Sequence, residues 1–128
     1  MTALPSGIPA DARDLVTSLL AEELRPVDAL RSELDAHLDA IKAAQASNEY
    51  VDVSLALRLT DVSRALLDEA EAKDTDDARR LAQAAVRYFI LDEDGENDLT
   101  SVHGLVDDAE VCNAVARALG RGDLVTGT

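Results

Sequence analysis

The chain has 128 residues, of which 47 % are hydrophobic, and a formal net charge of −14. This length and hydrophobic fraction predict one folded domain over residues 1–128 and argue against a disordered chain. The excess of 26 acidic over 12 basic residues argues against binding to nucleic acid or anionic membranes, because both need clustered Lys and Arg.

The ends of the chain are expected to be flexible tails, residues 1–9 and 121–128. A first helix is predicted after Pro9 and is expected to end at Arg25-Pro26, because a residue before proline is pushed out of the α region. Its apolar residues would support a homodimer if they formed an exposed stripe: Leu15, Val16, Leu19, Leu20 and Leu24.

The second helix is predicted by apolar residues at spacings of three and four, up to Ser47-Asn48: Val27, Leu30, Leu34, Leu38 and Ile41. The next segment, YVDVSLALRL, alternates like a strand. However, Leu55, Leu59, Val62 and Leu66 also fit a helical stripe that continues to about Ala72. We expect a third helix here, because a lone strand would have no partner in this chain.

The fourth helix is expected from Ala78 to about Leu91, with Asp74 or Thr75 as its N-cap. Asp107 and Glu110 resemble a capping box, which predicts that the fifth helix begins there; Gly120 should end it. Five helices with short connections predict an all-α fold, a compact antiparallel bundle.

The region from Asp92 to Ala116 contains eight acidic residues and no Lys or Arg. An acidic surface of this kind steers a basic protein partner. The expected partner-binding residues are the acidic ones of the segment together with two neighbouring aromatic anchors: Asp92, Glu93, Asp94, Glu96, Asp98, Tyr88 and Phe89. For Asp107, Asp108 and Glu110, capping of the fifth helix is the preferred role.

A divalent cation is the alternative reading of the same segment. Asp92, Asp94 and Glu96 alternate as the oxygen ligands of a calcium loop do, with Asp98 following. A regular EF-hand is excluded, because His103 stands where the bidentate Glu belongs, and the glycine is Gly95 whereas the sixth position of the loop is Asn97. A weaker calcium or magnesium site stays open; otherwise no cofactor is expected.

No catalytic arrangement is evident, and we expect a non-enzyme. His37, His103 and Cys112 are too few for a zinc site, and Cys112 is expected to be a buried, inert thiol. The single cysteine favours a reducing compartment. The opening MTALPSGIPADARD has no secretory signal, so a cytoplasmic location is expected.

The segment AVRYFILDEDGENDLTSVHGLVDDAEV resembles the core motif of the YkvA-like family of small bacterial helical proteins. It covers about a fifth of the chain, and its matching positions are Tyr88, Phe89, Asp98, Gly104, Leu105, Asp107 and Asp108. The family's biochemical role is unknown, so the resemblance implies only a compact helical domain.

Three functions therefore stay open from the sequence. The first is a small acidic protein-interaction module, with immunity or antitoxin proteins as its model. The second is a weak calcium- or magnesium-binding module. The third is a structural helical domain whose acidity only keeps it soluble.

Overall fold

The computed structural model describes residues 4–47, 54–91 and 102–125. They contain five α-helices, which confirms the predicted all-α bundle, and no strand occurs in these ranges. The helices are α1 (Arg13–Leu20), α2 (Val27–Ser47), α3 (Ser54–Lys73), α4 (Asp76–Leu91) and α5 (Val102–Ala118). Short 3₁₀ helices precede α1 (η1, Ala10–Ala12) and follow α5 (η3, Gly122–Leu124).

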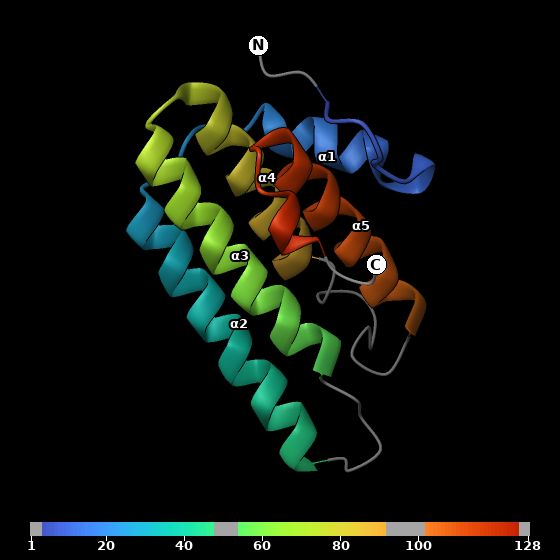
Figure 1. Cartoon of the computed structure of the whole chain (residues 1–128). Coiled ribbons are helices and arrows are strands. Elements are labelled where there is room, and N and C mark those ends of the chain that lie inside the picture. The colour runs from blue at the N-terminus through green and yellow to red at the C-terminus, as the bar shows by residue number, and fades with distance from the viewer. Residues whose placement is uncertain (1–3, 48–53, 92–101, 126–128) are drawn as a thin grey trace.

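Helix α4 is the centre of the bundle. It contacts each of the other four α-helices, and residues 81–86 are all buried. The small side chains of Ala82, Ala84 and Ala85 are fully buried and let the neighbouring helices approach closely. Figure 1 shows α2 and α3 as a long antiparallel pair beside this centre, with α1 running across the end of the bundle.

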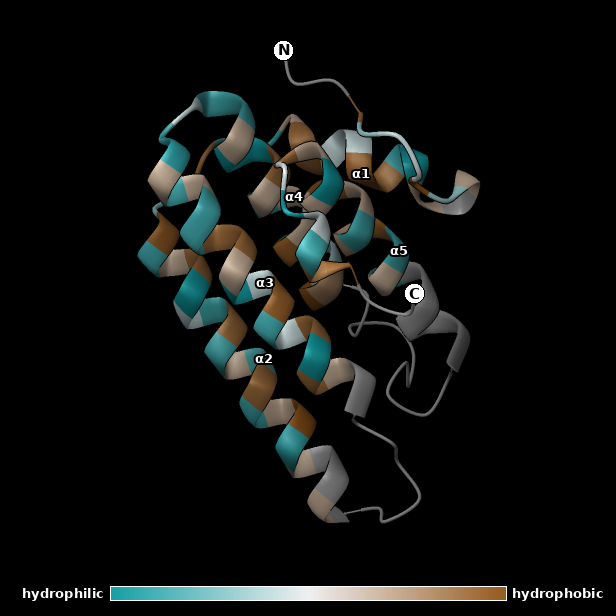
Figure 2. Ribbon diagram, viewed as in Figure 1, coloured by the Kyte–Doolittle hydropathy of each residue, from teal (hydrophilic) through white to brown (hydrophobic). Residues whose placement is uncertain are grey.

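The periodicity of α2 and α3 is confirmed. The inward positions Leu30, Leu34 and Ile41 of α2 and Leu59, Val62 and Leu66 of α3 are buried. Figure 2 shows apolar and polar residues alternating along both helices, as the amphipathic pattern requires. Residues 54–58, which alternate as in a strand, therefore form the first turn of α3, because apolar side chains among them pack against the core.

Two helix boundaries differ from the predictions, and a third, the start of α4, is now assigned to one N-cap residue. Helix α1 ends at Leu20, so the expected end at Arg25-Pro26 is wrong, and residues 21–26 form an irregular connector. Helix α5 begins at Val102, so the capping box at Asp107 is wrong as well. The N-cap of α4 is Thr75, whose Oγ1 accepts a hydrogen bond from the Ala78 N–H at 3.2 Å.

The apolar residues of α1 do not form an exposed stripe. Val16, Leu19 and Leu20 are buried, which leaves Leu15, 41 % exposed, as the outward apolar residue of this helix. The surface that was expected to support a homodimer is thus mainly core.

Residues 4–9 and 121–125, the described parts of the segments expected to be flexible tails, contribute to the core. Ile8 is buried, and Leu124 packs against the core. Arg121 pairs with Glu69 of α3 and with Asp123. These residues therefore belong to the folded domain.

Candidate functional site: a polar clamp and the surface charges around it

Most of the predicted binding residues lie outside the described ranges. These are Asp92, Glu93, Asp94, Glu96 and Asp98, which include every candidate metal ligand. The described part of the chain contributes the two helices that flank them, α4 ending at Leu91 and α5 beginning at Val102.

The two aromatic residues of the predicted site are in the core. Tyr88 is 6 % exposed and Phe89 is 2 % exposed. The Phe89 ring meets the His37 ring edge to face, with centroids 4.5 Å apart. The prediction that Tyr88 and Phe89 anchor a partner is wrong, because the fourth helix turns both side chains into the bundle.

A polar clamp, which sequence reasoning missed, fastens the 21–26 connector to α4. We define it as the side chains of Arg80, Gln83 and Arg87, which lie on one face of the helix at spacings of three and four. Arg80 Nη1 donates hydrogen bonds to the carbonyl oxygens of Leu20 at 3.1 Å and Glu22 at 2.9 Å.

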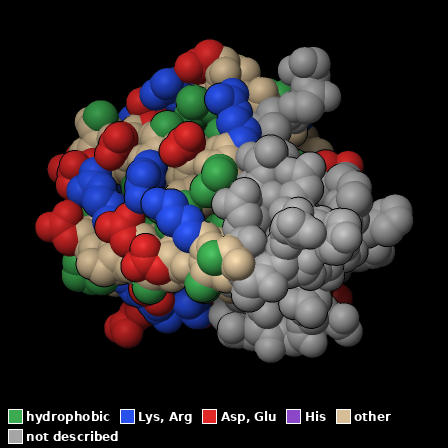
Figure 3. All heavy atoms as spheres, turned by 90° about the horizontal axis from the view of Figure 1, so that it is seen from below, with side chains coloured by type: hydrophobic (Ala, Val, Ile, Leu, Met, Phe, Trp, Pro, Cys, Tyr) green, Lys and Arg blue, Asp and Glu red, His purple; other side chains and the backbone are tan. Residues whose placement is uncertain are grey.

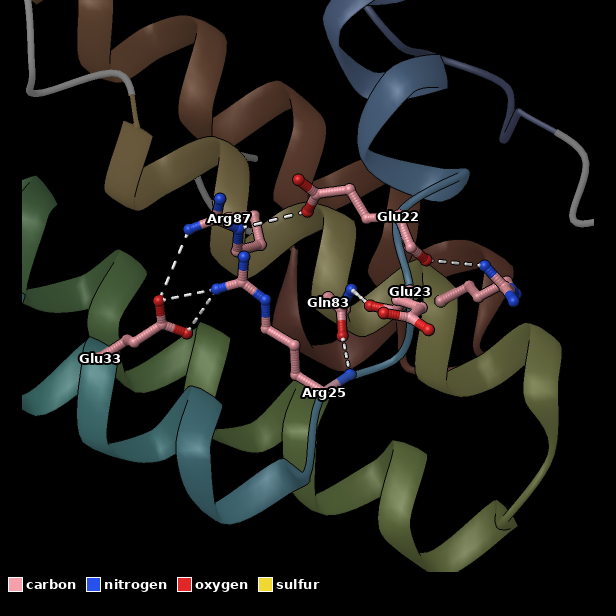
Figure 4. Close-up of polar contacts among 7 residues, drawn as sticks. Glu22, Glu23, Arg25, Glu33, Gln83 and Arg87 are labelled. Carbon is pink, nitrogen blue, oxygen red and sulfur yellow. Dashed lines mark hydrogen bonds and ion pairs between the residues drawn. The ribbon is translucent and has the colours of Figure 1, made fainter.

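The centre of the clamp is Gln83, which is 1 % exposed. Its Nε2 donates to the Glu23 carbonyl at 2.9 Å, and its Oε1 accepts from the Arg25 N–H at 2.8 Å (Figure 4). One carboxamide thus satisfies a backbone donor and a backbone acceptor of an irregular segment, which has no helix or sheet to do so.

A chain of alternating charges extends the clamp outward. Arg87 Nε contacts Glu22 at 3.3 Å, and its Nη1 lies 3.5 Å from Glu33. Glu33 also accepts two hydrogen bonds from Arg25 Nη1, at 2.9 and 3.2 Å. Figure 4 shows Glu33 of α2 between the two guanidinium groups, so this chain joins α2, α4 and the connector.

A second set of ion pairs joins α2 to α3. Arg31 lies 3.1 Å from Asp28, 2.7 Å from Asp68 and 3.2 Å from Glu71. These carboxylates raise the pKa of Arg31 above its already high ordinary value, so it stays charged. Figure 3 shows Lys and Arg side chains interleaved with Asp and Glu side chains on the face that it draws.

A hollow of about 430 Å³ lies between the connector and the neighbouring helix ends. Residues 24–28 line it together with Glu71 and Arg79. Its charged groups are already paired: Arg25 with Glu33, Asp28 and Glu71 with Arg31, and Arg79 with Asp74 at 3.3 Å. The hollow is therefore a feature of the surface ion network.

Cys112 is buried, as the sequence predicts, and it lies beside two other buried polar residues. Ser63 of α3 and Asp108 of α5 are these neighbours, and Ser63 Oγ has no hydrogen-bond partner among the described residues. Burial first, and then the charge of Asp108, raise the pKa of Cys112 to about 12. A thiol in this state is a poor nucleophile at neutral pH.

Basic and acidic residues are distributed differently along the chain. All 12 Lys and Arg residues lie within the described ranges, whereas seven acidic residues lie outside them. Eight of the basic residues form ion pairs with described carboxylates: Arg25, Arg31, Arg64, Lys73, Arg79, Arg80, Arg87 and Arg121. The described part therefore carries seven of the 14 net negative charges, and the rest lie between or beyond its helices.

Among the residues that the structure describes, no group of His, Cys, Asp and Glu is placed to hold a metal ion. No helix in these ranges is long and apolar enough to cross a bilayer. No family model, curated protein or solved structure matches the chain.

Proposed function

We propose that this chain is a small acidic, non-enzymatic protein-interaction module that recognises a basic surface on a partner protein. The residues assigned to recognition are Asp92, Glu93, Asp94, Glu96 and Asp98. An enzyme or toxin that the module restrains, as immunity and antitoxin proteins do, is the kind of partner that we propose. The proposed setting is the cytoplasm, which suits the single unpaired thiol of Cys112.

The observation that carries the proposal is the distribution of charge along the chain. Residues 92–101 contain five acidic and no basic residues. Eight of the 12 basic side chains are engaged in ion pairs within the described scaffold. Few cations of the chain itself are thus left to compensate the segment, and a basic partner would supply them.

The packing of the flanking helices also supports the proposal. Helix α4 contacts four other helices, and residues 111–116 of α5 are all buried. The helices before and after the proposed recognition residues therefore belong to the packed scaffold.

The test is a quantitative pull-down from native lysate with three forms of the protein. The first is wild type, and the second is D92N/D94N/E96Q/D98N. The third, E23Q/D39N/D61N/E110Q, is a matched control that removes the same charge from four exposed residues for which the structure gives no ion pair. We expect the same basic partner with wild type and control, and at least a tenfold loss with the segment variant.

Equal recovery by all three forms would contradict the proposal. Equal loss in both variants would show that only the net charge matters, which corresponds to acidity that serves solubility. Circular dichroism and thermal melting of each form ensure that any loss comes from recognition rather than unfolding.

The spacing of Asp92, Asp94, Glu96 and Asp98 favours one other function, a weak calcium- or magnesium-binding module. Calorimetric titration with each metal chloride at physiological salt tests it. Binding heat that is lost in D92N/D94N/E96Q/D98N and kept in the control variant would support it. No heat and no melting shift at millimolar metal would remove it.

A further inference from the structure

We draw no further inference here: the strongest candidate, the hollow between the 21–26 connector and the adjacent ends of α2, α3 and α4, carries nothing because each charged side chain in its lining is already ion-paired within the chain and nothing in the structure shows what would occupy it.

Discussion

The side-chain carboxamide of Gln83 accepts a hydrogen bond from the backbone N–H of Arg25 at 2.8 Å, across 58 positions of sequence. With its second bond, to the Glu23 carbonyl, it joins the central helix to the segment that connects α1 and α2. A polar residue inside an alanine-rich helix thus holds the segment that follows α1.

The first prediction concerns this residue. Gln83→Leu places an apolar side chain of similar size at the same position and removes both bonds, so a partly buried N–H and a partly buried C=O lose their partners. We expect the free energy of unfolding to fall by about 2 kcal/mol in urea titrations, since a buried unsatisfied group costs about 1–3 kcal/mol and these two groups keep some access to water.

Thr60→Val is the matched control for Gln83→Leu. Thr60 is also buried, but its hydroxyl donates only to the Ala56 carbonyl one turn earlier, which keeps its own helical partner. We expect a loss below about 1 kcal/mol for Thr60→Val. Equal losses in the two variants would show that the clamp contributes no more than an ordinary side-chain hydrogen bond.

The second prediction compares two ion pairs in double-mutant cycles. Arg87, 13 % exposed, is paired with Glu22 at the edge of the clamp, whereas Arg64 and Asp35 form a pair between exposed helix faces. We expect a coupling free energy of about 1–2 kcal/mol from Arg87→Met with Glu22→Gln, because partial burial weakens solvent screening.

For Arg64→Met with Asp35→Asn we expect at most about 0.5 kcal/mol, although its 2.6 Å separation is the shorter one. High salt should reduce the Arg64 coupling more than the Arg87 coupling. If the Arg64 cycle gave the larger coupling, distance rather than burial would decide the strength of these pairs.

The third prediction concerns the reactivity of Cys112. Because the thiol is buried and its pKa is about 12, it should react with Ellman's reagent only after unfolding. The reaction rate should rise with urea in parallel with the unfolded fraction. Fast labelling of the native protein at pH 8 would contradict this placement.

The raised pKa of Cys112 also makes the stability of the protein depend on pH. The folded state holds the thiol proton more tightly than the unfolded chain, in which the pKa is near 9.0. The contribution of the protonated Cys112 thiol to the free energy of unfolding is therefore fully present below pH 9, and it is lost as the pH rises toward 12. The difference in stability between wild type and Cys112→Ala should be constant up to this range and then shrink.

The fourth prediction concerns the end of α5. Gly120 has a φ of +78°, and the Arg121 N–H donates to the Ala116 carbonyl at 2.7 Å, as in a Schellman motif. An added Cβ at Gly120 would meet no atom within 4 Å, so Gly120→Ala should cost about 1 kcal/mol from backbone conformation alone.

Gly122→Ala is the control for Gly120→Ala, because Gly122 also has open space around it but no positive φ. Its thermal midpoint should equal or slightly exceed that of wild type, since alanine restricts the unfolded chain. A lower midpoint for Gly122→Ala than for Gly120→Ala would rule out the conformational explanation.

The fifth prediction tests the position of Phe89 in the core. Phe89→Ala should lower the free energy of unfolding by about 3–5 kcal/mol, because it opens a cavity beside His37. Leu15→Ala, on the outer face of α1, should change it by less than about 0.5 kcal/mol. A Phe89→Ala protein of wild-type stability would contradict the core position of the ring.

Local patterns were sufficient for most of the helices. The apolar spacing of Val27, Leu30 and Leu34 predicts α2, and the pair Asp74-Thr75 predicts the start of α4, because both signals act within a few residues of chain. Gly120 likewise marks the end of α5 through its own backbone freedom.

The errors arose where distant contacts compete with local signals. Residues 21–24 are compatible with a longer first helix, but Arg80 and Gln83 of α4 bind the carbonyls of Leu20, Glu22 and Glu23 instead. The acidic pair at Asp107 resembles a cap, yet the apolar spacing of Val102, Leu105, Val106 and Ala109 allows α5 to begin earlier. The polar spacing of Arg80, Gln83 and Arg87 within an alanine-rich helix was the one signal for the clamp.

The sequence by itself determined the all-α class, the amphipathic faces and the excess of negative charge, because periodicity and composition are properties of neighbouring residues. Only the tertiary structure decided that Tyr88 and Phe89 turn inward and that Gln83 fastens the 21–26 connector. The reason is that burial of a helix face depends on which other helices pack against it, and α4 contacts all four of the other α-helices.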